Sequence, residues 1–331
     1  MKNRKASKEF IDFDKNKQEK ESALVEVGIK ERRILLHPEE RQIISKEIEE
    51  LKEKIKAMNN ILSTEPDAPD LPPRAPLIKI TGVLEELSVL KVIGYFSDSE
   101  YDMERFRKQE KKDLVGGLLL AIAGNVAGSA VTSMSSTRKN DACDFIQGKI
   151  NGKNFQGWLG KTNASVGDYV EMVVVDKGNS FVVYAIAIPD LCTISITPRC
   201  DMGRWGALKD GFNFSIWFFA IFIFIVSASM LIFSDVSFLF VLKSILIPVA
   251  IFVAIFVAVS ISMVRSPNST VLLAEDIFET LEMPMATHVN LKHITKKKLR
   301  KIKSGKCSIG HVKNRILPDS WYFVDYLYYY K

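Results

Sequence analysis

The residue types that carry enzyme chemistry occur in this chain of 331 residues, but they do not stand at catalytic spacings. The segment GKT at residues 160–162 matches the end of a phosphate-binding loop. The first glycine of such a loop would have to stand where Phe155 is, so the phosphate cradle is missing. Asp168 and Glu171 could serve as a general acid and base, but a lone carboxylate pair usually belongs to a turn and a solvated face. We expect turns at both places.

Metal and thiol chemistry are not indicated by the sequence either. The four cysteines form no Cys-x-x-Cys pair and the four histidines are dispersed, so no zinc-site spacing appears. Cys192 and Cys200 could approach each other, but in the cytoplasm both would be reduced. No nucleophile elbow, metalloprotease motif or dinucleotide fingerprint occurs. We predict a protein that is not an enzyme and has no catalytic, metal-binding or cofactor-binding residues.

The strongest pattern in the chain is a pair of long apolar runs. Residues Phe212–Phe233 and Ser244–Val264 contain no Asp, Glu, Lys or Arg. A helix of about 20 such residues spans the ~30 Å hydrocarbon layer of a bilayer. Apolar residues face every direction in both runs, whereas a core helix usually keeps a polar stripe. We predict a transmembrane hairpin; the alternative is a hairpin buried in a large soluble core.

The limits of the two predicted spans follow from the sequence. Pro248 is compatible with a helix because it lies in the first turn or so of the second run. The connector at residues 234–243 is either an exposed turn or the beginning of a longer, tilted second helix. The membrane-spanning candidates are Phe212, Trp217, Phe233, Ser244, Pro248 and Val264.

Basic residues flank the two runs on one side. Arg204 and Lys209 precede the first run, Arg265 ends the second, and a lysine-rich block follows. Because positive residues remain on the cytoplasmic side, we predict a multi-pass membrane protein with both termini in the cytoplasm. No signal peptide is evident in residues 1–20.

The lysine-rich block indicates a partner. We expect it to contact anionic lipid head groups, although a merely solvated helix face would look the same. The net charge of +6 is mild and no RNA-recognition motif accompanies the block, so we predict no nucleic-acid binding. The lipid bilayer is therefore the first predicted partner. The candidate head-group contacts are Lys296, Lys297, Lys298, Arg300 and Lys301.

The part of the chain that precedes the two apolar runs divides into three segments. Residues 1–62 form a charged arm with an amphipathic helix from His37 onward, which either packs on its own domain or binds a second copy or partner. Residues 63–76 contain five prolines and form a linker of partly polyproline II character. Residues 77–200 alternate in polarity between tight turns such as Asn151-Gly152, which predicts a small β-barrel or rolled sheet of the OB or SH3-like kind.

An insertion at residues 97–141 interrupts this β domain. Its Gly/Ala-rich stretch, residues 114–134, is less apolar than the two long runs. The small residues Gly117, Ala121, Gly124 and Gly128 have the spacing that lets helices approach closely, which indicates helix packing and a homo-oligomer. We expect a re-entrant, interfacial or conditionally inserting segment; a helix packed within the protein is the alternative.

Residues 265–331 complete the predicted fold. They contain a helix over residues 270–283, the basic segment, and an aromatic end that suits a strand or an interfacial anchor. In fold class we predict an α+β membrane protein. A two-helix transmembrane hairpin is attached to a small cytoplasmic β-barrel, and an amphipathic helix precedes both.

Several motifs resemble a family of bacterial membrane proteins described as type VI secretion system effectors. They are ITGVLEEL at residues 80–87, INGKNFQGWL at 150–159, VGDYVE at 166–171, PRCDMGR at 198–204 and LAEDIFETL at 273–281. The resemblance covers most of residues 77–331. It implies delivery into a neighbouring cell by a secretion apparatus and damage to that cell's inner membrane.

The resemblance leaves a second role open. A protein that inserts by itself would also enter the membrane of the cell that makes it. The alternative is therefore a membrane-anchored immunity or accessory protein, which binds a partner through its cytoplasmic β domain. The predicted protein partners are accordingly a cognate toxin or immunity protein and the secretion apparatus.

Overall fold

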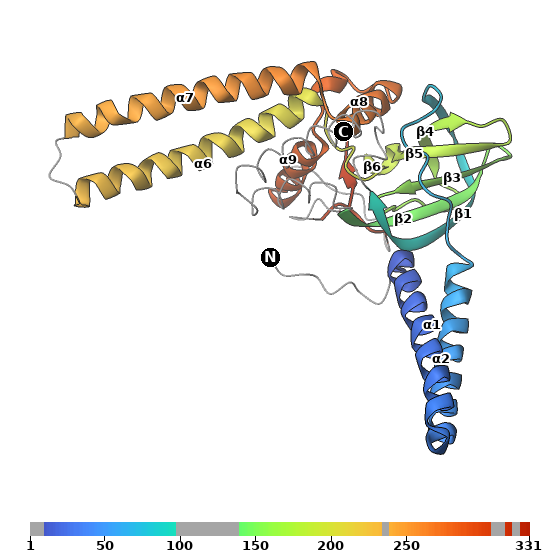
Figure 1. Ribbon diagram of the computed structural model, residues 1–331. Coiled ribbons are helices and arrows are strands. Elements are labelled where there is room, and N and C mark those ends of the chain that lie inside the picture. The colour runs from blue at the N-terminus through green and yellow to red at the C-terminus, as the bar shows by residue number, and fades with distance from the viewer. Residues whose placement is uncertain (1–9, 97–138, 234–237, 306–314, 320–324) are drawn as a thin grey trace.

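The chain folds as an α+β protein around a closed five-stranded β-barrel. The computed structural model describes residues 10–96, 139–233, 238–305, 315–319 and 325–331. Two pairs of helices leave the barrel region in crosswise directions (Figure 1). One pair is the N-terminal arm, α1 (Phe13–Leu36) and α2 (Arg41–Leu62), joined by the short helix η1 (Pro38–Glu40). The other is the hairpin of α6 (Arg204–Phe233) and α7 (Phe238–Arg265).

The barrel contains the first five strands of a seven-stranded sheet. Around the barrel the order is β1-β2-β3-β5-β4, and β4 pairs with β1 again. Closure depends on a parallel pairing between β3 and β5. Beyond β5, two further strands extend the sheet outside the barrel. The strands are β1 (Ile78–Phe96), β2 (Lys139–Ile150), β3 (Lys153–Leu159), β4 (Tyr169–Asp176), β5 (Ser180–Ile188), β6 (Thr193–Ile196) and β7 (Leu327–Tyr329).

Strand β1 belongs to both halves of the barrel because it is long and irregular in the middle. Residues 78–83 pair with β4, and residues 84–96 pair with β2. The register shifts between Leu84 and Glu86, as a β-bulge does. Close strand contacts are possible where side chains are absent: a Cβ on Gly157 would lie 2.4 Å from the carbonyl oxygen of Val183. A bulged strand and a glycine at the closure point therefore let so small a barrel close.

Two hydrophobic cores hold the fold together. The barrel interior is filled by aliphatic and aromatic side chains from β1 to β5, among them Ile146, Phe155 and Met172. The second core lies on the outer side of the sheet, where α8 (Ser269–Thr280) packs through Ile277 and Phe278. It also includes the C-terminal tyrosines and the N-terminal Phe13, so segments far apart in sequence meet there.

The C-terminal region is part of the β domain and not a separate unit. Strand β7 pairs with β6, and Tyr328 and Tyr329 are fully buried. Residues Leu327–Tyr329 of the aromatic end thus form a buried strand, as one of the two predicted alternatives has it; residues 320–324 lie outside the described residues. Helix α9 (Leu291–Lys303) follows the short helix η4 (Ala286–His288) and covers β7; η3 (Pro189–Leu191) connects β5 to β6.

The tight turns of the barrel lie where the sequence predicts them. Asn151 and Gly152 both have positive φ, 51° and 75°, as a type I′ hairpin requires. Gly178, with φ of 85°, turns the chain between β4 and β5. Strand β2 begins at Lys139, inside the range expected for the insertion, so most but not all of residues 97–141 lie outside the described residues.

The arm is a pair of helices rather than the single amphipathic helix that the periodicity indicates. Val27 of α1 packs against Ile44 and Ile48 of α2. Helix α2 ends at Leu62, and the linker then returns to the barrel (Figure 1). Helix α1 shows its amphipathic stripe weakly because apolar side chains also stand on its outer face, where Val25 and Ile29 are exposed.

Candidate functional site: the apolar hairpin and its mount

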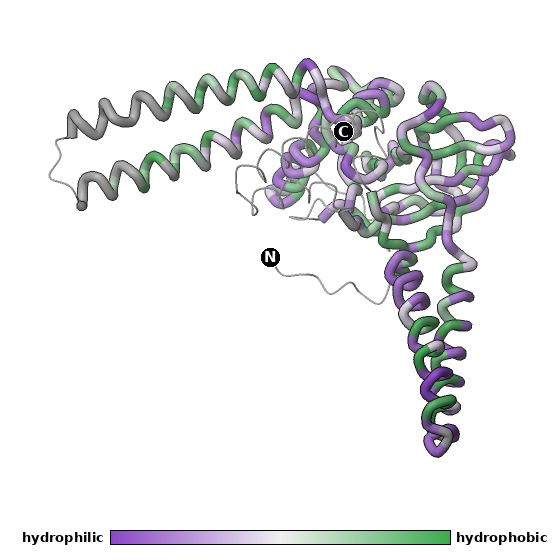
Figure 2. The backbone as a smooth tube through the Cα atoms, viewed as in Figure 1, coloured by the Kyte–Doolittle hydropathy of each residue, from purple (hydrophilic) through white to green (hydrophobic). Residues whose placement is uncertain are grey.

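Helices α6 and α7 lie antiparallel and contact each other through phenylalanine rings. The centroids of Phe219 and Phe252 are 3.9 Å apart, and those of Phe212 and Phe256 are 4.9 Å apart. Apolar side chains also point outward: Trp217 is 71% exposed and Phe224 is 73% exposed. Figure 2 shows the hairpin as mainly hydrophobic wherever it is coloured. Within the described residues, Arg204–Ile225 is long and apolar enough to cross a membrane, and its apolar window is not buried.

The ring contacts fix the register of the two helices. Because Phe212 lies level with Phe256, residues 257–264 of α7 run beside residues 204–211 of α6. That part of α6 contains the charged residues Arg204, Lys209 and Asp210. The second helix begins at Phe238, which agrees with a longer second helix and not with an exposed turn over all of residues 234–243.

A partly buried ion pair attaches the hairpin to α8. The Arg204 guanidinium donates from Nη2 to Oε2 of Glu275 at 2.6 Å and from Nε to both carboxylate oxygens at 3.0 Å. The backbone N–H of Arg204, at the beginning of α6, donates to Oε1 at 2.7 Å. Burial opposes ionisation of Glu275, but these hydrogen bonds outweigh it and hold its pKa below the ordinary value. One carboxylate therefore caps α6 and neutralises its first side chain.

Close backbone approach completes this attachment, which we call the mount (residues 201–206 with Glu275, η4 and Lys292). A Cβ on Gly203 would lie 2.6 Å from the carbonyl oxygens of Ala286 and Thr287, so only glycine fits there. The Trp205 ring stacks on His288 with centroids 5.9 Å apart. The hairpin is thus held against the β domain by packed backbone as well as by charge.

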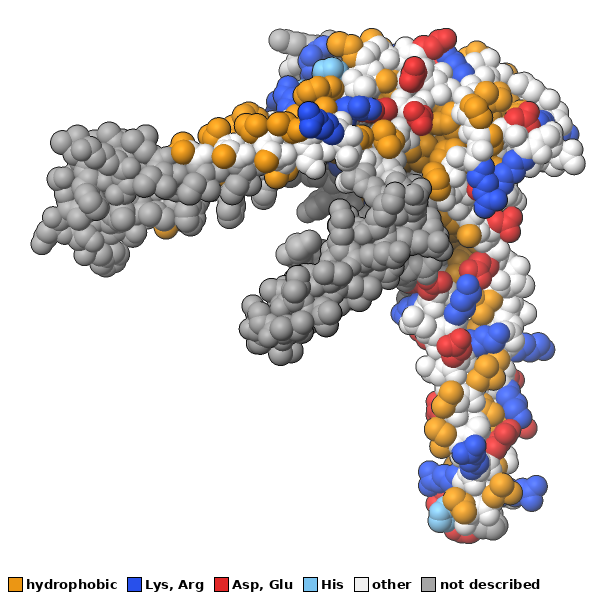
Figure 3. All heavy atoms as spheres, turned by 45° about the horizontal axis from the view of Figure 1, so that its top comes forward, with side chains coloured by type: hydrophobic (Ala, Val, Ile, Leu, Met, Phe, Trp, Pro, Cys, Tyr) orange, Lys and Arg blue, Asp and Glu red, His pale blue; other side chains and the backbone are white. Residues whose placement is uncertain are grey.

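Helix α9 is tied to the same place. Asp201, which is 3% exposed, forms an ion pair of 2.6 Å with Lys292 and accepts a hydrogen bond from the Tyr328 hydroxyl. Among the head-group candidates, Lys296, Lys297, Arg300 and Lys301 are exposed. Lys298 differs: its ammonium donates to the carbonyl oxygen of Lys331 and lies 4.9 Å from the centre of the Tyr329 ring. Figure 3 shows basic side chains near the base of the hairpin.

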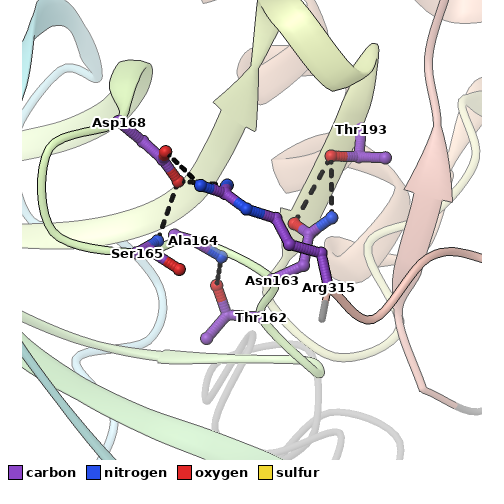
Figure 4. Close-up of polar contacts among 7 residues, drawn as sticks. All are labelled: Thr162, Asn163, Ala164, Ser165, Asp168, Thr193 and Arg315. Carbon is purple, nitrogen blue, oxygen red and sulfur yellow. Dashed lines mark hydrogen bonds and ion pairs between the residues drawn. The ribbon is translucent and has the colours of Figure 1, made fainter. Parts of the chain in front are cut away.

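The loop between β3 and β4 holds the GKT segment and Asp168 and is an internally bonded turn (Figure 4), while Glu171 lies at the beginning of β4. The Thr162 hydroxyl accepts a hydrogen bond from the backbone of Ala164, so the GKT segment presents no phosphate cradle. Asp168 receives two hydrogen bonds from Arg315, one of them at 2.6 Å. Glu171 forms an ion pair with Lys79 at 3.4 Å. Each carboxylate therefore faces a cation instead of its sequence neighbour.

The described cysteines are all free thiols. Burial raises the pKa values of Cys143 and Cys200, while Cys192 is half-buried. In the described part of the chain, no three His, Cys, Asp or Glu side chains gather where they could hold a metal ion.

The sequence-predicted site residues are distributed as follows. Phe212, Trp217 and Phe233 lie on α6, and Ser244, Pro248 and Val264 lie on α7. The helix-packing candidates Gly117, Ala121, Gly124 and Gly128 fall outside the described residues. Sequence reasoning missed the mount, because Glu275 stands far from Arg204 in the chain and neither position is unusual by itself.

Comparison with known proteins identifies no relative. No family model, no curated protein and no solved structure matches this chain.

Proposed function

We propose that this is an integral protein of the bacterial inner membrane and that α6 and α7 cross the bilayer together. The outward-facing aromatic and aliphatic side chains of the hairpin carry this proposal, since Trp217, Phe224 and Ile225 are each at least 60% exposed. So large a continuous apolar surface is costly in water and favourable among lipid tails. The β domain, α8, α9 and the C-terminus all lie at one end of the hairpin, which agrees with a cytoplasmic location for both soluble parts (Figure 1).

The register of the hairpin refines the spans. With the bilayer beginning at the level of Phe212 and Phe256, the embedded parts are residues 212–233 and 238–256, about 33 Å and 28 Å long at ~1.5 Å per residue. Residues 257–264, which include the exposed Val257 and Val259, then lie at the head-group boundary beside residues 204–211. The exposed lysines of α9 stand at this end, where anionic head groups would attract them.

At the membrane, the resemblance supports a role as a type VI secretion system effector that damages the membrane of a competing bacterium. Two helices cannot enclose a pore, so damage requires several copies. The Gly/Ala-rich stretch at residues 114–134 offers the close-packing faces for such a homo-oligomer. A specific observation favours the second role, a membrane-anchored immunity or accessory protein: the chain carries a folded closed barrel, which perforation does not need.

Membrane residence is tested by alkaline carbonate extraction of the expressed chain. The wild type should stay in the membrane pellet, and Phe224→Asp combined with Ile225→Asp should move the chain to the supernatant or abolish its accumulation. The matched control is Val25→Asp with Ile29→Asp on the arm, where side chains are similarly exposed but distant from the hairpin. Wild-type protein that is released by carbonate, unaggregated, would contradict the proposal.

The two roles are separated by induced expression in a host that lacks the protein. Growth arrest together with dye-reported depolarisation supports the effector. Unaffected growth, together with protection against a co-expressed toxin, rules out the effector role and supports the immunity protein. The substitutions Gly124→Leu and Gly128→Leu should abolish depolarisation if the small faces assemble the damaging oligomer.

A further inference from the structure

The proline-rich linker lies against the outer face of the barrel instead of running free between two domains. We call residues 63–76 the strap. It contains no helix or strand beyond Leu62, yet Pro66, Pro69 and Leu71 are half-buried. Beneath it lies an aromatic surface that we call the groove, formed by Phe145 of β2, Trp158 of β3 and Tyr184 of β5.

Two aromatic side chains hold the strap by its backbone. The indole N–H of Trp158 donates to the carbonyl oxygen of Asp67 at 2.8 Å, and the Tyr184 hydroxyl donates to the carbonyl oxygen of Asp70 at 2.7 Å. Tyr184 is 2% exposed. Burial, followed by the charge of Asp70, raises its pKa, so the hydroxyl remains a donor at every physiological pH.

The spacing of these contacts is three residues, which is the repeat of polyproline II. The strap sequence has the same period: Pro66, Pro69 and Pro72 recur every third residue, and an aspartate follows each of the first two. Carbonyl groups three residues apart lie on the same side of a polyproline II segment. Donors on the neighbouring strands β3 and β5 can therefore form hydrogen bonds with both. The repeat ends at Asp70, where the chain makes a three-residue turn: the backbone N–H of Leu71 donates to the carbonyl oxygen of Pro69.

Charge adds a preference for acidic peptides. Oδ2 of Asp70 accepts no well-directed hydrogen bond within the described residues, but it forms an ion pair of 2.9 Å with Lys177. The strap does not fill the groove: a cavity of about 360 Å³ remains, lined by strap residues together with the aromatic floor and Lys177. Aromatic floors with indole and phenol donors are the means by which proteins bind proline-rich segments.

We propose that the groove is a binding site for acidic, proline-rich peptide segments of a partner protein, and that the strap is its occupant within the same chain. A partner segment with Pro-Asp repeated every third residue satisfies the same two donors and the same lysine. The strap lowers the affinity for the partner, because a tethered ligand has an effective concentration in the millimolar range. The inference is independent of membrane insertion, since it concerns the β domain alone.

The experiment uses the full chain in detergent and a fluorescent peptide with the sequence of residues 64–76. In the strap variant, Pro66, Pro69 and Pro72 are replaced by Gly, and Asp67 and Asp70 by Ser. Fluorescence anisotropy should show the peptide binding the strap variant at least tenfold more tightly than the wild type. Adding Trp158→Phe and Tyr184→Phe, which leave an aromatic ring at each position and remove both donors, should weaken binding at least tenfold. A peptide with lysine at both aspartate positions should also bind more weakly.

A second measurement keeps the proposal testable if the strap variant does not fold. Arg74 is exposed, and its side chain is 88% accessible, so trypsin can report on strap release in the wild-type chain. Excess peptide should accelerate cleavage after Arg74, and the lysine-substituted peptide should not. Absence of binding to a folded strap variant at millimolar peptide would overturn the proposal. The proposal would also be overturned if the wild type formed dimers that the strap substitutions convert to monomers. The groove would then bind the strap of a second copy and not a partner protein.

Discussion

Glu275→Gln should release the hairpin from the β domain without unfolding the barrel. The glutamine keeps the shape of the side chain and can still accept one hydrogen bond from the backbone of Arg204. It cannot neutralise the guanidinium, which then lies beside α8 without the carboxylate that caps α6. The perturbation is therefore confined to the charge that attaches α6 to α8.

The free-energy cost of Glu275→Gln follows from how deeply the ion pair is buried. Removing one partner of a fully buried ion pair costs about 3–5 kcal/mol, and removing one at the surface costs below about 1 kcal/mol. Here the side chain of Glu275 is 8% exposed and that of Arg204 is 31% exposed, so water reaches the cation only. We expect an intermediate cost of about 2 kcal/mol, which is roughly a 30-fold shift toward the undocked state.

The effect depends on pH with a definite sign. Because hydrogen bonds from Arg204 outweigh burial and hold the pKa of Glu275 below its ordinary value, its contribution is fully present above that ordinary value. It is lost as the pH falls through the lowered pKa of the folded state. The difference between wild type and Glu275→Gln should therefore be constant near neutral pH and shrink in acid.

Hydrogen exchange of the full chain in lipid nanodiscs measures this opening directly. Amides of α8 around residues 273–278 should exchange about 30-fold faster in Glu275→Gln at pH 7, with barrel amides unchanged. Glu279→Gln on the exposed face of the same helix is the matched control and should change exchange by less than about twofold. If amide exchange in α8 were accelerated equally in both variants, or if exchange were accelerated throughout the barrel, the Arg204–Glu275 ion pair would not be what holds the hairpin against α8.

Two further predictions concern the same region and the thiols. Gly203→Ala should destabilise docking of the hairpin by about 1–3 kcal/mol, because the new Cβ would press on two carbonyl oxygens. The control Gly211→Ala, whose Cβ would meet no atom within 4 Å, should have no effect in the same exchange assay. In a Cys307→Ser background, maleimide should label the half-buried Cys192. Cys143 and Cys200 are buried and have raised pKa values, so they should react roughly a hundredfold more slowly until the chain is denatured. Rapid labelling of Cys200 in the native chain would contradict the second prediction.

Local patterns made the barrel predictable. Asn151-Gly152 marks its hairpin because positive φ at both residues is a local requirement, and the same holds for Gly178. The two apolar runs indicate long helices for the same reason, since composition within a window decides helix length. The five strands and the hairpin helices therefore follow from residues that are close together in the chain.

Contacts between distant residues could not be predicted in this way. Glu275 meets Arg204, and Trp158 meets the carbonyl of Asp67, only after the chain has folded. The register of α6 and α7 likewise depends on residues far apart in the chain: the tilted rings of Phe212 and Phe256 meet and place residues 257–264 beside residues 204–211.

This register has a consequence for how the β domain stands at a membrane. If the hydrocarbon begins at Phe212, residues 204–211 form a stretch of helix about 12 Å long between the bilayer core and the mount. The head-group layer on one side of a bilayer is about 5–8 Å thick, so the mount lies just beyond it. At that distance the lysine side chains of α9 can reach the head groups. The arm leaves the barrel crosswise to the hairpin, so its two helices would run parallel to the membrane plane at the level of the barrel (Figure 1).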